Sequence, residues 1–270
     1  MSYVANARMY SVNAAAATAW TELFGWLARE SRVDLTVVPH AYPAPLPELW
    51  ARPDLACAFM CGFPYTRARH PPLPVVAPVP RAAPVQGRPL YATCLVVKAD
   101  RDYASLEDTF GGRLGFTVED SHSGYNALRH HLLPYWRRRH TPLYAESIGP
   151  LTTPRRVIDA VLAGDIDVGP LDAYALNLML RHEPELRRQI KVVAATDAAP
   201  IPFLVASPQC PRDVIAALRQ ALLDFGDAPG LDDLKDRLCL ERFVTVDVAD
   251  YGVIARWEAE AIAAGYPQPR

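Results

Sequence analysis

The chain has 270 residues, of which half are hydrophobic, and its 28 Lys and Arg residues nearly balance 30 Asp and Glu residues, for a net charge of −2. That length accommodates two domains of ordinary size, or one large one, with a sizeable core. The balanced charge excludes the strongly basic profile of a nucleic-acid-binding protein, so we expect no nucleic-acid partner.

The first residues show no basic start followed by a long apolar run, so no secretory signal is visible. No segment approaches the roughly 18 consecutive apolar residues of a membrane span. We therefore expect a protein without a membrane span, cytoplasmic as the sequence stands and periplasmic if its N-terminus has been trimmed.

Apolar runs and helical periodicities alternate along the chain. Short apolar runs predict strands over 5–10, 34–38, 54–60, 73–78, 91–98, 113–118, 166–171, 190–196, 203–207 and 243–246, with one more ending at 147–149. Helical spacing predicts helices over 14–30, 46–50, 106–110, 124–135, 154–163, 173–181, 211–225, 231–238 and 251–265. Such alternation predicts an α/β fold with mainly parallel sheet.

Two proline clusters, at 78–89 and 200–202, indicate where the chain crosses between two lobes. The predicted first lobe is discontinuous and comprises 1–91 plus 197–270. The predicted second lobe comprises 92–196.

The stretch GFTVEDSHSGY at 115–125 is the strongest functional signal in the second lobe. An apolar strand ends in a polar cluster, and a helical pattern follows. Ser121 or Ser123 can cap that helix, because a short side-chain oxygen accepts from an unpaired first-turn N–H. Spare N–H groups and the positive end of the helix dipole also make such a turn an anion site. Capping alone remains the alternative interpretation.

Two further strand ends carry candidate residues. Cys61 and Gly62 follow the apolar strand 54–60, and ligands bind outside the carboxyl ends of strands in open α/β sheets. A nucleophilic role for Cys61 has no identifiable partner histidine, so a passive thiol is favoured. Asp172 ends the strand 166–171, where it can either cap the helix 173–181 or contact a ligand.

The cysteines do not form a recognisable framework. Their number is odd and none are spaced as CxxC: Cys57, Cys61, Cys94, Cys210 and Cys239. Neither a disulfide pattern nor a zinc site can be read from them. No nucleotide-binding loop is recognisable either, so we predict no metal and no cofactor.

Four segments in order resemble the substrate-binding proteins of phosphate, phosphite and phosphonate ABC transporters. They are DLACAFMCGFPYTRA, SLEDTFGGRLGFTVEDSHSGY, RRVIDAVLAGDIDVGPLDAYAL and IKVVAATDAAPIPFLVASPQCPRDVIAALRQALL, and they span roughly 54 to 223. Each motif is weak alone, but their order is specific. The resemblance implies a type 2 periplasmic-binding-protein-like fold: two α/β lobes, two crossover strands, and a ligand in the cleft between the lobes.

The resemblance also implies which residues bind the ligand. In the family an S-T-S-G-Y segment binds phosphate or phosphonate oxygens at a helix N-terminus, which here corresponds to Ser121, His122, Ser123, Gly124 and Tyr125. His122 departs from the usual threonine. Because an isolated imidazole has a pKa near 6.5, anion binding through it is expected to depend on pH.

The remaining walls of the predicted cleft come from other loops. The resemblance places Tyr10 after the first strand, and Cys61, Gly62 and Tyr65 after the third. Asp172 matches an acid that faces the ammonium group in binders of amine-bearing phosphonates.

The leading hypothesis is a non-catalytic binding protein for a small oxyanion, possibly partnered by an ABC permease. An alternative is a cytoplasmic enzyme with the same fold, of the kind found in the futalosine route to menaquinone or in pyrimidine-precursor synthesis. A third is an intracellular ligand sensor.

Overall fold

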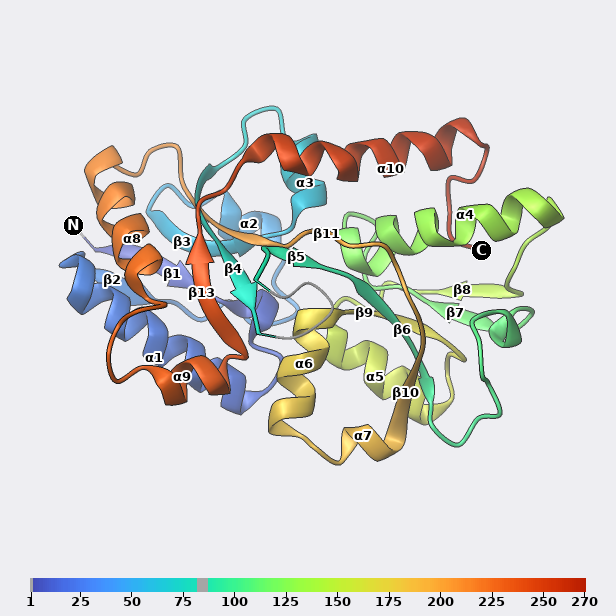
Figure 1. Cartoon of the computed structure of the whole chain (residues 1–270). Helices are drawn as coiled ribbons and strands as arrows, with labels where there is room; N and C mark the ends of the chain where they lie inside the picture. The colour runs from blue at the N-terminus through green and yellow to red at the C-terminus, as the bar shows by residue number, and fades with distance from the viewer. Residues whose placement is uncertain (1, 82–86) are drawn as a thin grey trace. The chain divides into compact units, whose positions relative to one another are not determined.

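The computed structural model describes residues 2–81 and 87–270, and the chain divides into two compact units (Figure 1). The first unit comprises Met1–Leu90 and Pro200–Asp250, and the second comprises Tyr91–Ala199 and Tyr251–Arg270. The sequence assigned the last segment to the first lobe, whereas Tyr251–Arg270 groups with the second unit. The chain therefore passes between the units three times, where two crossings were expected.

The first unit is built on a six-stranded sheet with the order β13-β4-β12-β3-β1-β2. Its strands are β1 (Tyr3–Asn6), β2 (Leu35–Val37), β3 (Leu55–Met60), β4 (Leu73–Pro80), β12 (Phe203–Ala206) and β13 (Leu240–Val244). Strand β1 runs parallel to β2 and β3, but β12 is antiparallel to both β3 and β4, and β13 is antiparallel to β4. The prediction of mainly parallel sheet was therefore wrong, and the sheet is mixed. Strands β12 and β13 return from elsewhere in the chain, so no right-handed crossover constrains their direction.

Helices pack around this sheet. They are α1 (Ala14–Ser31), α2 (Leu46–Trp50), α3 (Gly62–Arg67), α8 (Arg212–Asp224) and α9 (Asp232–Arg237). Helix α1 starts at Asn13, whose side chain accepts from the Ala16 N–H, and it buries Trp20, Leu23, Phe24 and Leu27 at the predicted spacing.

The predicted first strand ends early, at Asn6. The Asn6 Oδ1 accepts from the Arg8 N–H at 2.7 Å, which turns the backbone. The chain then forms the 3₁₀ turn η1 (Arg8–Tyr10) in place of the end of the strand.

The second unit contains a three-stranded sheet with the order β10-β6-β9 and a parallel pair, β7-β8. Its strands are β6 (Thr93–Lys98), β7 (Arg113–Gly115), β8 (Glu146–Ile148), β9 (Gly169–Asp172) and β10 (Ile190–Ala195). Both neighbours of β6 are antiparallel to it. The short strands β5 (Leu90–Tyr91) and β11 (Ala199–Pro200) pair with each other where the chain passes between the units.

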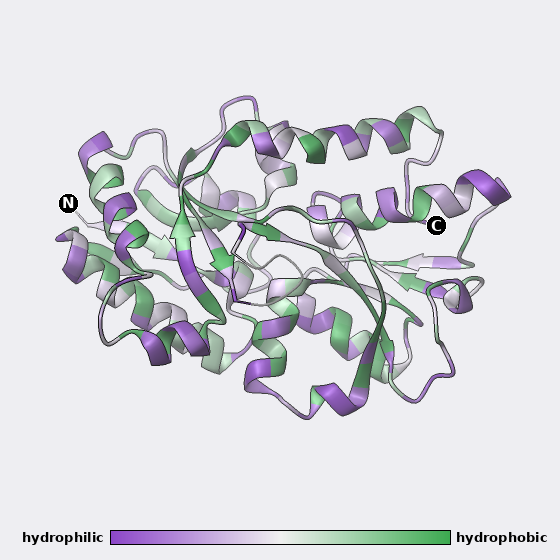
Figure 2. Cartoon of the chain, viewed as in Figure 1, coloured by the Kyte–Doolittle hydropathy of each residue, from purple (hydrophilic) through white to green (hydrophobic). Residues whose placement is uncertain are grey.

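The helical elements of the second unit include one 3₁₀ turn and one π turn. They are η2 (Glu107–Thr109), η3 (His122–Asn126), α4 (Ala127–Arg139), α5 (Pro154–Ala163), α6 (Ala173–His182), α7 (Leu186–Gln189) and α10 (Gly252–Ala263). The 3₁₀ turn η4 (Val248–Tyr251) spans the boundary between the two units. Hydrophilic and hydrophobic residues alternate around α10 in Figure 2, as expected of a helix with one buried face.

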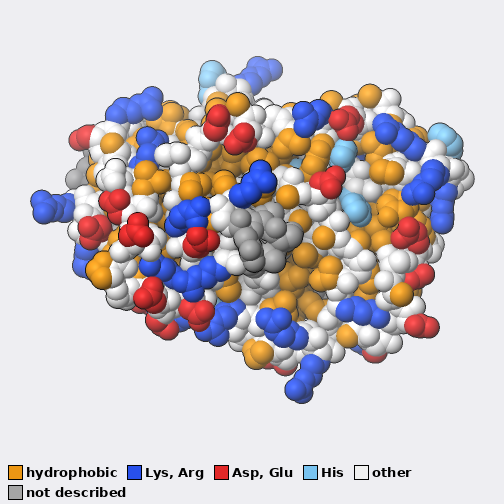
Figure 3. Space-filling model, viewed as in Figure 1, with side chains coloured by type: hydrophobic (Ala, Val, Ile, Leu, Met, Phe, Trp, Pro, Cys, Tyr) orange, Lys and Arg blue, Asp and Glu red, His pale blue; other side chains and the backbone are white. Residues whose placement is uncertain are grey.

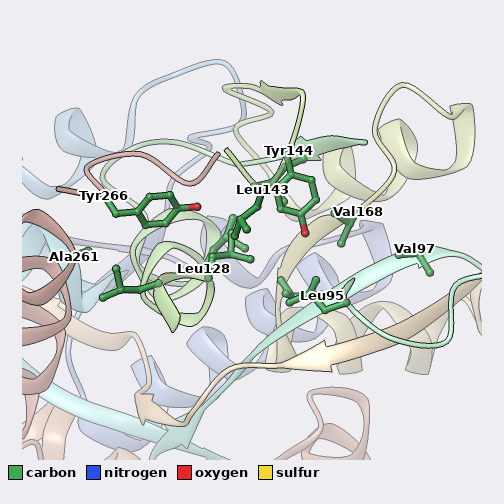
Figure 4. Close-up of a cluster of buried hydrophobic side chains, with 12 residues drawn as sticks. Leu95, Val97, Leu128, Leu143, Tyr144, Val168, Ala261 and Tyr266 are labelled. Carbon is green, nitrogen blue, oxygen red and sulfur yellow. The ribbon is translucent and has the colours of Figure 1, made fainter. Parts of the chain in front are cut away.

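The core of the second unit explains why the C-terminal segment belongs to it. Figure 4 shows Leu95, Leu128 and Tyr144 in a buried cluster that also contains Ala261 and Tyr266 from the end of the chain. Ala261 of α10 and Tyr266 beyond the helix are buried in this core, so residues far apart in sequence fold as one body.

Candidate functional site

The polar turn after β7 has the cap that the sequence predicted. Ser121 is the N-cap residue, and its Oγ accepts from the Gly124 N–H at 3.0 Å. The first turn, His122–Asn126, is π-helical: the Asn126 N–H donates to the Ser121 carbonyl at 3.0 Å, five residues back. Helix α4 continues directly from it, so the turn has a long helix and its dipole behind it.

Side chains along this turn alternate in exposure. Ser121 and Ser123 are partly exposed, whereas His122 and Gly124 are buried. The Ser123 carbonyl accepts from Thr93 Oγ1 at 3.1 Å. The backbone of Thr93 is itself held by Thr196: the Thr93 N–H donates to Thr196 Oγ1, and the Thr93 carbonyl accepts from the Thr196 N–H, both at 3.0 Å. The turn is thus anchored to strand β6, an anchor for which the sequence carries no local signal.

Gly124 allows the turn to lie against the strand-end loop. A Cβ atom at Gly124 would lie 1.8 Å from Thr117 Oγ1, far inside contact distance. The Thr117 N–H donates to the Gly124 carbonyl at 3.3 Å. Only glycine fits this close approach, which explains why the motif has a glycine at position 124.

Tyr125 is buried in the second unit. Its ring packs edge-on against Phe116 with centroids 5.5 Å apart, and the Arg129 guanidinium lies 5.5 Å from the ring centroid. Burial, together with Glu119, raises the pKa of Tyr125, so its hydroxyl stays protonated near neutral pH.

His122 does not behave as a titrating loop residue. Its ring is 1% exposed and stacks on Trp257, with centroids 5.3 Å apart. Burial, reinforced by His130, lowers the pKa of His122 to about 3. The expectation of pH-dependent binding through this ring was wrong, because the imidazole is neutral throughout the neutral range. The imidazole is therefore enclosed within the unit, whereas Ser121 and Ser123 beside it are partly exposed.

Asp172 is a helix cap. Its Oδ1 accepts from the N–H groups of Tyr174 at 2.8 Å and Ala175 at 3.1 Å, at the start of α6. The capping alternative is therefore confirmed, and one carboxylate oxygen is already engaged by two backbone donors.

The four candidate residues of the first unit lie in or beside its core. Tyr10 packs edge-on against Phe59, with centroids 4.8 Å apart, and is 1% exposed. Cys61 is buried and Gly62 opens the short helix α3, where the sequence predicted a loop. Tyr65 packs edge-on against Phe203 at 4.8 Å.

Surface charge is mixed, in keeping with the composition. On the face shown in Figure 3, basic and acidic side chains are interspersed. Within the part of the chain that the structure describes, no helix has both the length and the hydropathy needed to cross a membrane.

The family described as "ABC transporter, phosphonate, periplasmic substrate-binding protein" matches residues 10–251 of the chain. The chain belongs to this phosphonate-binding family. That match includes the polar turn and all ten candidate residues, and it places the chain among the substrate-binding proteins of transporters.

Solved structures show the fold expected of the phosphonate-binding family. A binding-protein component of an ABC phosphonate transporter from Pseudomonas aeruginosa superposes with a TM-score of 0.81 at 16% identity, covering 98% of this chain and 88% of that one. PhnD1 from Prochlorococcus marinus, in complex with methylphosphonate, gives 0.74 at 14% identity, covering 96% and 98%. XAC2383 from Xanthomonas citri, bound to ATP, gives 0.65 at 17% identity, covering 98% of each chain. No curated protein sequence matches the chain. The α/β fold of type 2 periplasmic binding proteins is thus confirmed.

Proposed function

We propose that this protein binds a small oxyanion of the phosphate or phosphonate class and delivers it to an ABC permease without chemical change. The observation that carries the proposal is the turn at 121–125: two partly exposed serines stand at the N-terminus of an unbroken helical run, in a chain of the phosphonate-binding family. Backbone N–H groups and the helix dipole at such an end favour a bound anion.

Dipoles and hydroxyls, not a formal positive charge, would hold the anion in this turn. The neutral His122 ring contributes no charge at neutral pH, since its pKa is lowered to about 3. The anion would therefore depend on the geometry of the N–H groups and of the Ser121 and Ser123 hydroxyls. Binding is then expected to show no titration step near pH 6.5 that originates in the protein.

The rest of the site remains a prediction from the family resemblance. It assigns Tyr10, Cys61, Gly62 and Tyr65 to the opposite wall of an inter-lobe cleft, with Tyr125 and Asp172 beside the turn. The description of the family as periplasmic favours that compartment over the cytoplasm. Methylphosphonate, the ligand named for the Prochlorococcus protein, is the first compound to try.

The sharpest test is Ser121→Asp. Aspartate caps helices as well as serine does, so the Gly124 N–H keeps an acceptor and thermal stability should be unchanged or slightly raised. The added carboxylate would repel an oxyanion at this turn, so affinity for inorganic phosphate and methylphosphonate, measured by isothermal titration calorimetry, should fall more than tenfold.

Thr141→Asp is the matched control, because Thr141 is an exposed residue with a hydroxyl side chain, in the same unit and outside the turn. Its affinity should stay close to the wild-type value. If the wild-type protein gains no thermal stability from either ligand at concentrations far above a micromolar Kd, or if Ser121→Asp binds as the wild type does, the proposal is refuted. Consumption of the ligand over time would instead indicate an enzyme.

A further inference from the structure

The C-terminal segment 251–270 contacts the buried side of the turn at 121–125. His122, Asn126 and Arg129 are spaced i, i+4 and i+7, and each of them contacts the segment 251–270. These contacts span more than a hundred residues of sequence, so they form only when the C-terminal segment has folded onto the second unit.

Asn126 is the centre of these contacts. It is fully buried, and its Oδ1 accepts from Arg129 Nη2 at 2.8 Å, which fixes the orientation of the amide. Its Nδ2 donates to the Ile254 carbonyl at 3.0 Å and lies 3.3 Å from His122 Nδ1. With both amide hydrogens used in this way, His122 Nδ1 is the acceptor, and the ring proton resides on Nε2.

Trp257 of α10 packs on His122. The Trp257 ring stacks on two histidines: the ring centroids are 5.3 Å apart for His122 and 4.7 Å apart for His130, where the interplanar angle is 4°. His130 Nε2 in turn lies 2.8 Å from Glu260 Oε2, one turn farther along α10. Helix α10 thus packs on the turn and on the start of α4 through consecutive aromatic contacts.

Arg129 extends the connection to the tail of the chain. It is 4% exposed, and its Nη1 donates to the Pro267 carbonyl at 2.8 Å while Nη2 donates to Asn126. Its guanidinium also lies over the ring of Tyr125, the last residue of the motif. A buried network of this kind restricts its members to one arrangement because each loss leaves a partner unsatisfied.

We propose that Asn126 is a positioning residue for the oxyanion site, and that the segment 251–270 is the element against which it holds the turn. The proposal rests on the proposed function, because the turn is taken to bind the anion. Its physical basis is preorganisation: an anion gains most from N–H groups that are already fixed in the free protein. If the turn is mobile in the free protein, ordering its N–H groups reduces the free energy of binding.

The experiment compares Asn126→Asp with Leu133→Ala. Aspartate at position 126 keeps an oxygen that accepts from Arg129, but it removes the two N–H donors of the Asn126 amide. Leu133 is a buried core residue of α4 and makes none of these hydrogen bonds. We expect the Kd for inorganic phosphate to rise at least tenfold in Asn126→Asp and less than twofold in Leu133→Ala, both measured at a temperature where circular dichroism shows folded protein. If Asn126→Asp does not fold, Trp257→Phe, which retains an apolar ring, takes its place with an expected rise of at least threefold.

Amide hydrogen exchange gives a readout that needs no ligand. The Gly124 amide donates to Ser121 Oγ, so its exchange should accelerate at least tenfold in Asn126→Asp relative to the amides of β6, and less than twofold in Leu133→Ala. An unchanged phosphate Kd in Asn126→Asp overturns the positioning role, while loss of binding in Ser121→Asp still supports the function. If the wild type binds no oxyanion, the function fails, and an unchanged Gly124 exchange rate overturns the positioning role independently.

Discussion

Gly124→Ala tests the close approach on which the turn depends. The new Cβ would meet Thr117 Oγ1 at 1.8 Å, Cβ at 2.8 Å and Cγ2 at 2.9 Å. The nearest atoms belong to the short, β-branched side chain of the buried Thr117, so they cannot move away without a shift of the backbone. The substitution should therefore separate the turn from the loop 116–120.

The expected loss of stability follows from two opposing effects. Alanine in a helix is favoured over glycine by about 0.5–1 kcal/mol, because the unfolded chain has less freedom to lose. Overpacking of a well-filled site costs about 1–3 kcal/mol, and a 1.8 Å approach belongs at or above the upper end. We expect a net loss of about 2 kcal/mol in the free energy of unfolding.

Urea denaturation followed by circular dichroism measures this loss, with Gly252→Ala as control. A Cβ at Gly252, in the same unit, has nothing within 4 Å, so that variant should be neutral or slightly stabilised. Adding Thr117→Gly removes all three obstructing atoms, and the double-mutant cycle should show a favourable coupling of about 1–3 kcal/mol. Full stability of Gly124→Ala, or a coupling near zero, would refute the steric reasoning.

Three other predictions concern buried polar groups of the second unit. Among the described residues, none lies within hydrogen-bonding reach of the buried Thr117 Oγ1, so Thr117→Val should raise the melting temperature slightly; a fall in phosphate affinity would show instead that this hydroxyl contacts the ligand. The pKa of His122 is lowered to about 3 in the folded protein, so between pH 6.5 and 3 the ring is protonated in the unfolded chain but neutral in the folded one. The free energy of unfolding should therefore fall as the pH is lowered through that window, by up to about 1.4 kcal/mol per pH unit. In His122→Gln that part of the pH dependence of urea unfolding should be absent; an unchanged pH profile would contradict the assignment. Asp172→Ala should lose about 1 kcal/mol of stability and Asp172→Asn little, since asparagine retains the cap acceptor; equal losses would argue against capping by Oδ1.

Local patterns in the sequence determined the classes of element and the position of the turn. Helix α1 buries the residues that its spacing predicted, and Ser121 caps the helix that follows the polar cluster. These features depend on periodicity and on neighbours a few residues away, which a single sequence contains. The family resemblance rested on the same local motifs, and the family match confirms it.

Tertiary structure alone decided strand direction and the destination of the last segment. Strands β12 and β13 run against β3 and β4, and Tyr251–Arg270 joins the second unit through its buried face. Neither outcome is encoded within one element, because both depend on which distant surface leaves an apolar face uncovered.

The histidine in the turn shows the same division. The sequence located His122 between two serines at a helix start, and the expectation from there was a titrating ring that contacts the anion. Its inward orientation depends on a π-helical turn, on the amide of Asn126 and on Trp257 from the end of the chain. Burial by those partners, not the residue type, sets its charge, because desolvation disfavours the protonated ring.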